Sequence, residues 1–382
     1  MCRYLFVGLD YGGTWKPMLG LAGMLMERGH AVTVLGAPFM RARAESAGCA
    51  FILLPDSFDD PEGWAPEDDD WAIYSQRICG PDLALALAPA VADSAADAIV
   101  FDCLLLNAIS AAEQLETPSA VIVHFLWYEY LSELPNDYDE WIELVNETRE
   151  QLELDRLPPA TGIPDLWDRM DAILSLPPPA WTRGRLPDKV LEVGPIANEP
   201  KGESIWTLPW PPDDDTPLIV ISLSSSYMHQ EDLLERLAAA ASGVAANTVL
   251  SLAGVIPRDA VRVPEAVEVV DWLNFQVVLP HTDLLVTHGG QATVSAGMRH
   301  EVPLLICPLG RDQSRVGGHV VEDGTGILLD PSASLDEIRK SMTRLLDARS
   351  GFGKAASLAS ERLRSLGDGR MAVEALEVLG AG

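Results

Sequence analysis

Basic residues are scarce in this chain of 382 residues. It contains 27 Lys and Arg against 57 Asp and Glu, which gives a formal net charge of −30 at pH 7. Proteins that bind nucleic acid neutralise its phosphates with Lys and Arg, and adhesion to an anionic membrane also needs basic residues. The composition therefore argues against nucleic acid and against an anionic membrane as partners.

Cysteines and long apolar runs are also few. The cysteines are odd in number and show no CxxC spacing, which favours free thiols in a reducing compartment. No apolar run approaches the ~20 residues that span a bilayer, and residues 2–8 are typical of a first strand rather than of a signal peptide. We expect a cytoplasmic protein without a membrane span, as a monomer or a homodimer. The five cysteines are Cys2, Cys49, Cys79, Cys103 and Cys307.

The chain opens with a strand, a helix and a second strand. Residues 4–8 are apolar, a helical stripe follows from Pro17, and residues 31–35 are apolar again. This βαβ unit predicts a parallel sheet, and the length favours two domains. The glycines at 8, 12 and 13 lack GxGxxG spacing, which argues against a dinucleotide-dependent dehydrogenase. Further strands are expected at 98–101, 119–123, 190–193, 218–223, 248–252, 267–270, 283–287, 303–307 and 326–329.

Two stretches interrupt this pattern. Residues 127–185 are rich in Trp, Glu, Asp and Pro, and predict amphipathic helices and turns rather than strands. Residues 198–217 are rich in Pro and Asp and mark a domain boundary. The predicted organisation is an N-terminal domain (1–197), a linker (198–217), a second domain (218–365) and a C-terminal helix (366–382).

The most informative segment covers residues 287–329. An apolar strand ends at His288-Gly289-Gly290, and a helix follows. The glycines let the backbone approach a ligand closely, and the start of a helix offers unpaired N–H groups with a partial positive charge. His288 adds a donor at the carboxyl end of a strand, where open α/β sheets bind ligands. These features predict an anion site, most simply for a diphosphate.

A carboxylate and a carboxamide follow the next apolar strand. Asp312-Gln313 offers acceptors and donors together, which suits the vicinal hydroxyls of a sugar. The ordered set of motifs resembles the donor-binding signature of GT-B nucleotide-sugar glycosyltransferases of natural products, which reads HGGxGT, GVP and PxxxDQ. Ala292 and Glu301 replace the usual glycines, and the residues 310–313 (GRDQ) are similar to the actinobacterial branch that uses deoxysugar donors.

The resemblance implies an α/β protein of GT-B fold, with two Rossmann-like domains facing across a cleft. The first domain would bind the acceptor and the second the nucleotide sugar, and the last helix would cross back to the first. The implied reaction is the inverting, metal-independent transfer of a hexose or deoxyhexose from a dTDP- or UDP-sugar. The acceptor would be a small lipophilic natural product, and no cofactor is expected.

The resemblance and the strand ends together give the expected site residues. Trp272 matches a Trp that stacks on the nucleobase, with a core Trp as the alternative. The serines after residue 223 would face the diphosphate, or form a plain turn. The donor-binding set is Ser224, Ser225, Trp272, His288, Gly289, Gly290, Gln291, Ala292, Thr293, Asp312 and Gln313, and the acceptor-binding set is Trp15, His124 and Trp127.

The resemblance is incomplete at the catalytic base. The family has a His in a GHxxP turn and a partner Asp at the end of a later strand; here Thr14 stands at the His position and Asp102 matches the Asp. The catalytic candidates are Asp102, Thr14 and Asp10. Three explanations of the missing His are open. Asp102 or Asp10 would be the base, directly or through water or Thr14. Alternatively, the acceptor would need little activation, or the chain would have lost catalysis. His124 is a further candidate base, with a packed histidine as the alternative.

Two acidic runs are possible metal sites, and two other functions are alternatives to glycosyl transfer. Residues 68–70 and 213–215 are triple-Asp runs in Pro-rich context, which predicts solvated loops rather than metal sites. A non-catalytic nucleotide-sugar-binding protein and a GT-B-fold epimerase or phosphorylase remain as rival functions at this stage.

Overall fold

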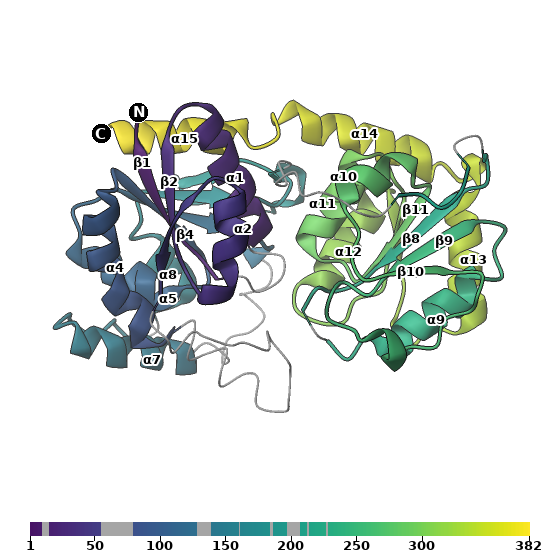
Figure 1. Cartoon of the computed structure of the whole chain (residues 1–382), viewed down its shortest axis with the longest axis horizontal. Helices are drawn as coiled ribbons and strands as arrows, with labels where there is room; N and C mark the ends of the chain where they lie inside the picture. The colour runs from purple at the N-terminus through teal and green to yellow at the C-terminus, as the bar shows by residue number, and fades with distance from the viewer. Residues whose placement is uncertain are drawn as a thin grey trace. The chain divides into compact units, whose positions relative to one another are not determined.

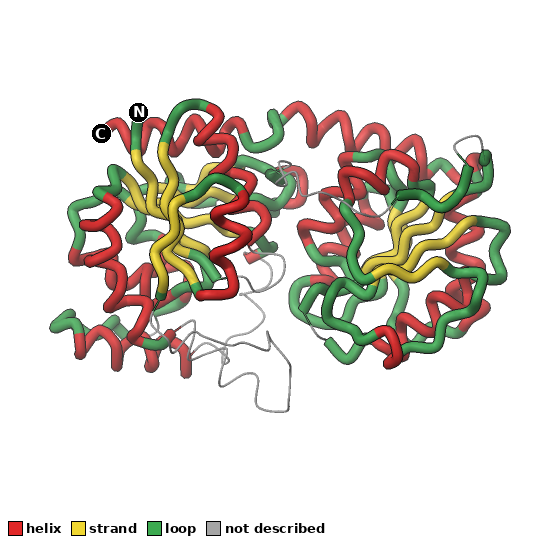
Figure 2. Tube along the Cα trace, viewed as in Figure 1, coloured by secondary structure: helices red, strands yellow, loops and turns green. Residues whose placement is uncertain are grey.

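The chain forms two compact units in the computed structural model, residues 1–200 with 366–382 and residues 201–365 (Figure 1). The structure describes residues 1–9, 15–54, 79–127, 139–159, 161–183, 186–196, 207–211, 214–226 and 228–382. In each unit the helices pack around one sheet (Figure 2). None of the described helices is both long and apolar enough to cross a membrane.

The first unit contains a seven-stranded sheet in the order β3-β2-β1-β4-β5-β6-β7, and all of its pairs are parallel. The central strands are apolar and buried on both faces, as parallel strands covered by helices require. The strands are β1 (Arg3–Val7), β2 (Ala31–Gly36), β3 (Ala50–Leu53), β4 (Ala98–Asp102), β5 (Ser119–Val123), β6 (Ala172–Ser175) and β7 (Val190–Glu192).

Strand β6 corrects the interpretation of residues 127–185, from which no strand was expected. It pairs with β5 on one side and with β7 on the other. Its four residues are too short to show a period, and its burial depends on partners remote in sequence. The helices of this unit are α1 (Trp15–Glu27), α2 (Arg41–Ser46), α4 (Pro81–Ser94), α5 (Leu106–Ala111), α7 (Asp139–Gln151), α8 (Ile163–Trp167) and α15 (Arg370–Ala381).

The C-terminal helix α15 belongs to the first unit. It packs on α1 and β4, and the Tyr4 hydroxyl donates to the Leu376 carbonyl at 3.0 Å. The preceding helix α14 (Phe352–Ser365) is separated from α15 by a break in which Gly367, Asp368 and Gly369 all have positive φ. The chain passes from the second unit to the first at this break.

The second unit contains a six-stranded sheet in the order β10-β9-β8-β11-β12-β13, again wholly parallel. The strands are β8 (Leu218–Ser222), β9 (Asn247–Ser251), β10 (Glu268–Val270), β11 (Leu284–Thr287), β12 (Leu304–Ile306) and β13 (Gly326–Leu328). The remaining helices are α9 (Glu231–Ala241), α10 (Phe275–Val278), α11 (Gln291–Arg299), α12 (Gln313–Glu322) and α13 (Leu335–Leu346).

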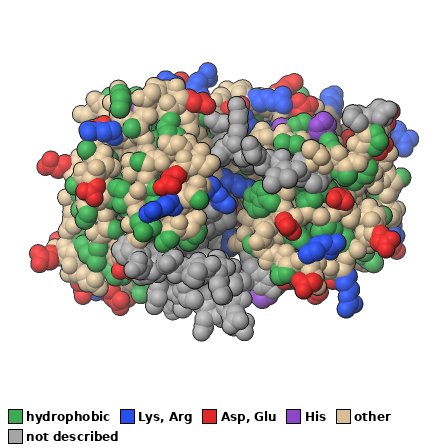
Figure 3. All heavy atoms as spheres, in the orientation of Figure 1, with side chains coloured by type: hydrophobic (Ala, Val, Ile, Leu, Met, Phe, Trp, Pro, Cys, Tyr) green, Lys and Arg blue, Asp and Glu red, His purple; other side chains and the backbone are tan. Residues whose placement is uncertain are grey.

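The strand order identifies one place on each sheet where a ligand is expected. The order reverses direction between β1 and β4 in the first unit and between β8 and β11 in the second. Loops diverge at such a point, and ligands of open α/β sheets bind in the crevice beyond the carboxyl ends of the strands. Both units carry acidic and basic side chains spread over the face in Figure 3, so charge alone does not mark either place.

Candidate functional site

The donor-site residues named from the sequence gather at the carboxyl edge of the second sheet. β8 and β11 are parallel neighbours, and Ile221 pairs with Val286. The loop of Ser224–Ser226 and the His288-Gly289-Gly290 segment therefore leave the sheet side by side, on the two sides of the point where strand order reverses. Met228 and Gln313, which follow β8 and β12, also meet, with the Gln313 amide nitrogen 3.5 Å from the Met228 sulfur.

The two glycines of this segment are required by close packing. Gly289 has φ +97°, and a Cβ there would lie 2.9 Å from Ile306 and 3.1 Å from the Gln313 carbonyl oxygen. At Gly290 a Cβ would lie 2.6 Å from Nε2 of His288. Helix α11 then begins at Gln291, and no side chain caps its N-terminus. Its first N–H groups can therefore receive an anion.

The imidazole of His288 is neutral rather than charged. Its side chain is only 8% exposed, and Nδ1 lies 3.3 Å from the Thr287 hydroxyl. Burial, aided by the nearby positive charge of Arg311, lowers the pKa of His288 to about 3. The imidazole is thus uncharged near neutral pH, and the positive potential expected of this site falls to α11 and Arg311. Arg311 was not named from the sequence, although it lies inside the GRDQ segment.

Gln291 is the one predicted donor-site residue with buried side-chain polar atoms that lack a partner among the described residues. Both its carboxamide oxygen and nitrogen are buried and have no partner among the described residues. Buried polar groups are rarely left unpaired, so a polar ligand at the start of α11 would satisfy this side chain. Ala292 and Thr293 complete the first turn of the helix and are half-buried.

The serines of the Ser224–Ser226 loop differ in their surroundings. The Ser224 side chain is 3% exposed, and its hydroxyl accepts from the Ser226 N–H at 3.1 Å while the Gln230 amide donates to its carbonyl at 2.9 Å. Ser224 therefore holds the turn together, which is the alternative weighed from the sequence. Ser225 and Ser226 are half-buried and lie nearer the surface.

Asp312 and Gln313 are placed together but are not equally available. The Gln313 carboxamide oxygen accepts from the N–H groups of Leu309 and Gly310, at 2.7 and 3.1 Å. Gln313 is therefore largely engaged in shaping the loop after β12, and only 2% of it is exposed. Asp312 directly precedes α12 and is 9% exposed, so it is the less buried of the two.

Trp272 is an exposed aromatic side chain on the same edge of the sheet. It follows β10 and is 46% exposed, unlike the core Trp that was the alternative. It lies over the loop after β9, where a Cβ on Gly254 would be 3.8 Å from its ring. A large aromatic face at this position suits a planar base.

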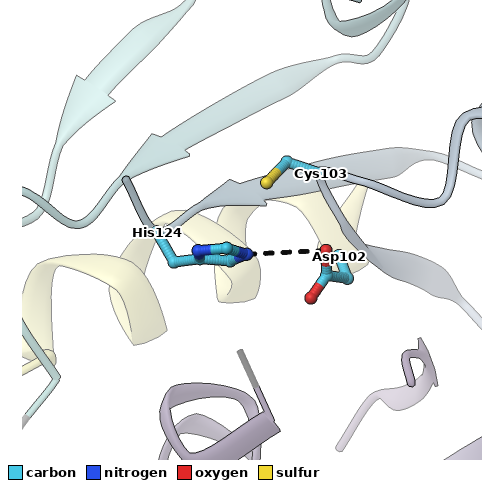
Figure 4. Close-up of side chains that lie close together, drawn as sticks. All are labelled: Asp102, Cys103 and His124. Atoms are coloured by element: carbon cyan, nitrogen blue, oxygen red, sulfur yellow. Dashed lines mark ion pairs between the residues drawn. The ribbon is translucent and has the colours of Figure 1, made fainter. Parts of the chain in front are cut away.

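The first unit brings together Asp102 and His124, two separate candidates for the catalytic base. Asp102 ends β4, and His124 follows the adjacent strand β5 (Figure 4). His124 Nε2 lies 3.7 Å from Asp102 Oδ1, and the same oxygen accepts from the Leu104 N–H at 2.9 Å. Cys103 is fully buried beside the pair.

The titration of this group follows from burial and mutual charge. Burial raises the pKa of the Cys103 thiol, so it is neutral near pH 7. Burial alone would lower the pKa of His124, but its neighbours outweigh burial and raise that pKa well above its ordinary value. Because the Cys103 thiol is neutral near pH 7, the charge that raises it is that of the Asp102 carboxylate. Asp102, Cys103 and His124 are also the one described group with three metal-ligand atoms within 4.8 Å of one another.

The remaining sequence-predicted residues are placed as follows. Trp15 is 0% exposed and its ring lies beside Gly8, so it presents no surface to a ligand. Trp127 is 6% exposed and packs edge-on against Trp167 at 5.2 Å. Asp10 and Thr14 lie outside the described residues, as do residues 68–70 and 213 of the acidic runs.

The described part of the second acidic run has a structural use. The Asp214 carboxylate accepts from the Thr216 N–H and from the Asn247 side chain, both at 2.9 Å. It borders a surface hollow that Thr248 also lines, at the amino end of β9. The hollow is thus at the opposite edge of the sheet from the donor-site loops, and we assign it no chemistry.

Known proteins match this chain in sequence. Residues 235–367 match the family described as Erythromycin biosynthesis protein CIII-like, C-terminal domain. The uncharacterized UDP-glucosyltransferase YojK of Bacillus subtilis is 22% identical, over 98% of this chain and 97% of its own length. The demethyllactenocin mycarosyltransferase of Streptomyces fradiae is 34% identical, over 30% of this chain and 25% of its own length.

Solved structures match the fold of the whole chain. The glycotransferase of kitacinnamycin superposes with a TM-score of 0.80 at 20% identity, covering 99% of this chain and 98% of that one. The glycosyltransferase VinC in complex with dTDP gives 0.72 at 18% identity, covering 100% of both chains. The predicted fold and the resemblance to glycosyltransferases are confirmed: the chain is a glycosyltransferase of GT-B fold, and its residues 235–367 match the Erythromycin biosynthesis protein CIII-like C-terminal domain.

Proposed function

We propose that the chain transfers a hexose or deoxyhexose from a dTDP- or UDP-sugar to a small lipophilic natural product. The observation that carries this proposal is that the uncapped start of α11, a buried neutral histidine and an exposed tryptophan all follow the carboxyl ends of strands in the second sheet. The helix start would bind the diphosphate, the histidine would donate to the diphosphate oxygens, and the tryptophan would stack on the base. The full-length relative is named a UDP-glucosyltransferase, and one structural neighbour binds dTDP.

In the proposed donor site, different loops bind different parts of the nucleotide sugar. The N–H groups at the start of α11 and the imidazole N–H of His288 receive the diphosphate. Trp272 stacks on the base, and Asp312 accepts from sugar hydroxyls. Gln291, with both polar atoms unpaired, supplies a further donor and acceptor at the same helix start.

The proposed chemistry is a single displacement that inverts the anomeric carbon. The acceptor oxygen attacks that carbon while the bond to the diphosphate breaks, and negative charge grows on the departing oxygen. Preorganised N–H donors stabilise such charge without reorganising, which is the role of His288 and α11. Neither a cofactor nor a metal has a part in this scheme, and the location proposed for the enzyme is the cytoplasm.

Product analysis tests the function. We would incubate the chain with dTDP- and UDP-sugars and a panel of phenolic, alcoholic and amine acceptors, and detect glycosides by mass spectrometry. The proposal expects a glycoside together with one equivalent of nucleoside diphosphate. Conversion of the donor to an epimer without an acceptor would instead support an epimerase, and donor binding without any turnover would support an auxiliary protein.

Chelation should leave the reaction intact. Because helix N–H groups and His288 replace a metal at the diphosphate, we expect less than a twofold change in rate after dialysis against EDTA, measured with the same glycoside assay. Complete loss, reversed by Mg²⁺ or Mn²⁺, would contradict the metal-independent mechanism. It would also reopen the acidic runs as ligands.

Replacing Trp272 by alanine should weaken donor binding specifically. Base stacking contributes ~1–3 kcal/mol per base, so we expect roughly a tenfold rise in the KM for the nucleotide sugar. The rate kcat should change little, because the base is remote from the reacting bond. A normal donor KM in Trp272→Ala, with normal stability, would remove the stacking assignment.

A further inference from the structure

His124 and Asp102 are brought together by the topology of the first sheet. β4 and β5 are adjacent and parallel, and Asp102 pairs in register with Ile122, two residues before His124. Both side chains therefore stand at the carboxyl edge of the sheet, next to the place between β1 and β4 where strand order reverses. Figure 4 shows the imidazole and the carboxylate facing each other, with the Cys103 sulfur to one side.

The geometry of the pair resembles that of a base and its orienting carboxylate. The distance of 3.7 Å from Nε2 to Asp102 Oδ1 exceeds a hydrogen bond, but catalytic hydrogen bonds are often long before substrate binds. Nε2 is buried and has no other partner among the described residues. The His124 side chain is 15% exposed although Nε2 is buried, so its accessible surface lies on other atoms of the side chain.

The neighbouring groups are unsuited to take a proton themselves. Cys103 is 0% exposed, and its thiol is neutral because burial raises its pKa. Asp102 is 3% exposed and already accepts from the Leu104 N–H. A buried carboxylate beside an imidazole instead fixes the tautomer and stabilises the imidazolium. Thr14, the sequence candidate at the usual position of the base, has no acid–base chemistry near neutral pH.

We propose that His124 is the general base for the acceptor and that Asp102 is its positioning residue. With Nε2–H directed at Asp102, Nδ1 accepts the proton as the acceptor O–H bond breaks. The electron pair of that bond forms the new bond from oxygen to the anomeric carbon. The bond from that carbon to the diphosphate oxygen breaks, and the nucleoside diphosphate leaves with its electron pair. The inference rests on the proposed glycosyl transfer and names the residue that would start it.

The pH profile follows from the charges that face the imidazole. Among the described residues the titratable groups beside it are Asp102 and Cys103. The charge of the Asp102 carboxylate raises the pKa of His124, and a base works only when unprotonated. Activity should therefore fall as pH drops through a pKa that lies above the ordinary value for histidine. Removing the Asp102 charge should move this acid limb to lower pH.

The test compares variants in the glycoside assay. His124→Gln should lower kcat by roughly 10²–10⁴-fold, the usual contribution of a general base, and leave the donor KM unchanged. Asp102→Asn should lower kcat and shift the acid limb of kcat/KM to lower pH, which a merely structural carboxylate would not do. The matched control is His30→Gln, because His30 also pairs with a carboxylate, Glu377 at 2.9 Å, but precedes β2 at the opposite edge of the same sheet.

The possible results distinguish a wrong base assignment from a wrong proposal of glycosyl transfer. A kcat within twofold of normal in His124→Gln, or a loss in His30→Gln as large as in His124→Gln, would overturn the base assignment while leaving glycosyl transfer standing. So would one equivalent of tightly bound zinc whose removal abolishes activity, since Asp102, Cys103 and His124 would then be its ligands. Failure of the unaltered chain to form any glycoside would overturn both proposals.

Discussion

Replacing His288 by alanine should lower kcat by roughly 10²–10³-fold, the usual effect of removing one preorganised donor from an oxyanion-type site. The imidazole is neutral, since burial holds its pKa near 3, so it acts through its N–H and not through a charge. Negative charge grows on the diphosphate as its bond to the anomeric carbon breaks. The N–H of His288 therefore stabilises the transition state more than the ground state. The KM for the nucleotide sugar should rise by a smaller factor.

Steady-state kinetics with a fixed acceptor measures this prediction, with thermal unfolding as a check on the fold. The matched control is His281→Ala, because His281 is exposed and lies only seven residues earlier in the same unit. We expect kinetics close to normal in the control. Unaltered turnover in His288→Ala, with the control also normal, would remove the diphosphate role of His288.

Replacing Gly290 by alanine should reproduce most of that loss without deleting the imidazole. The backbone at Gly290 has φ −61°, which alanine adopts without strain. The added Cβ would nevertheless lie 2.6 Å from Nε2 and 2.9 Å from Cε1 of His288, so the ring must turn away. We expect kcat to fall by roughly 100-fold, because a misplaced donor stabilises the leaving group poorly.

The double variant His288→Ala with Gly290→Ala tests whether Gly290→Ala acts through His288. If Gly290→Ala acts through His288, then adding it to His288→Ala should cost much less than it costs alone, since the two changes share one target. Gly318→Ala is the control: it lies in α12 of the same unit, and its Cβ would meet nothing within 4 Å. Fully additive losses in the double variant would show that Gly290 serves the site in another way.

Most strands and the donor-site segment were predictable from the sequence because their signals are local. The run of residues 283–287, the glycines after His288 and the helix that follows fix a strand, a turn and a helix start within a few residues. Short apolar runs also gave β8, β9 and β12 to within two residues. The four residues of β6 carried too little pattern, and their burial depends on β5 and β7.

The details of both sites were not predictable because they depend on contacts between remote segments. Nothing local in the sequence shows that the Gln313 oxygen is taken up by the N–H groups of Leu309 and Gly310. The neutrality of His288 arises from burial and from Arg311. Likewise, the approach of His124 to Asp102 requires that β4 and β5 be neighbours in register, which is a property of the fold.

The central claim is that the carboxyl edge of the second sheet binds a nucleoside diphosphate. Calorimetric titration of the full chain with dTDP and with UDP tests this claim most directly, using the unaltered chain and His288→Ala. We predict one site per chain for at least one of the two nucleotides, with the affinity weakened about tenfold or more in His288→Ala. Absence of binding by both nucleotides, or equal affinity in the unaltered chain and in His288→Ala, would contradict the account.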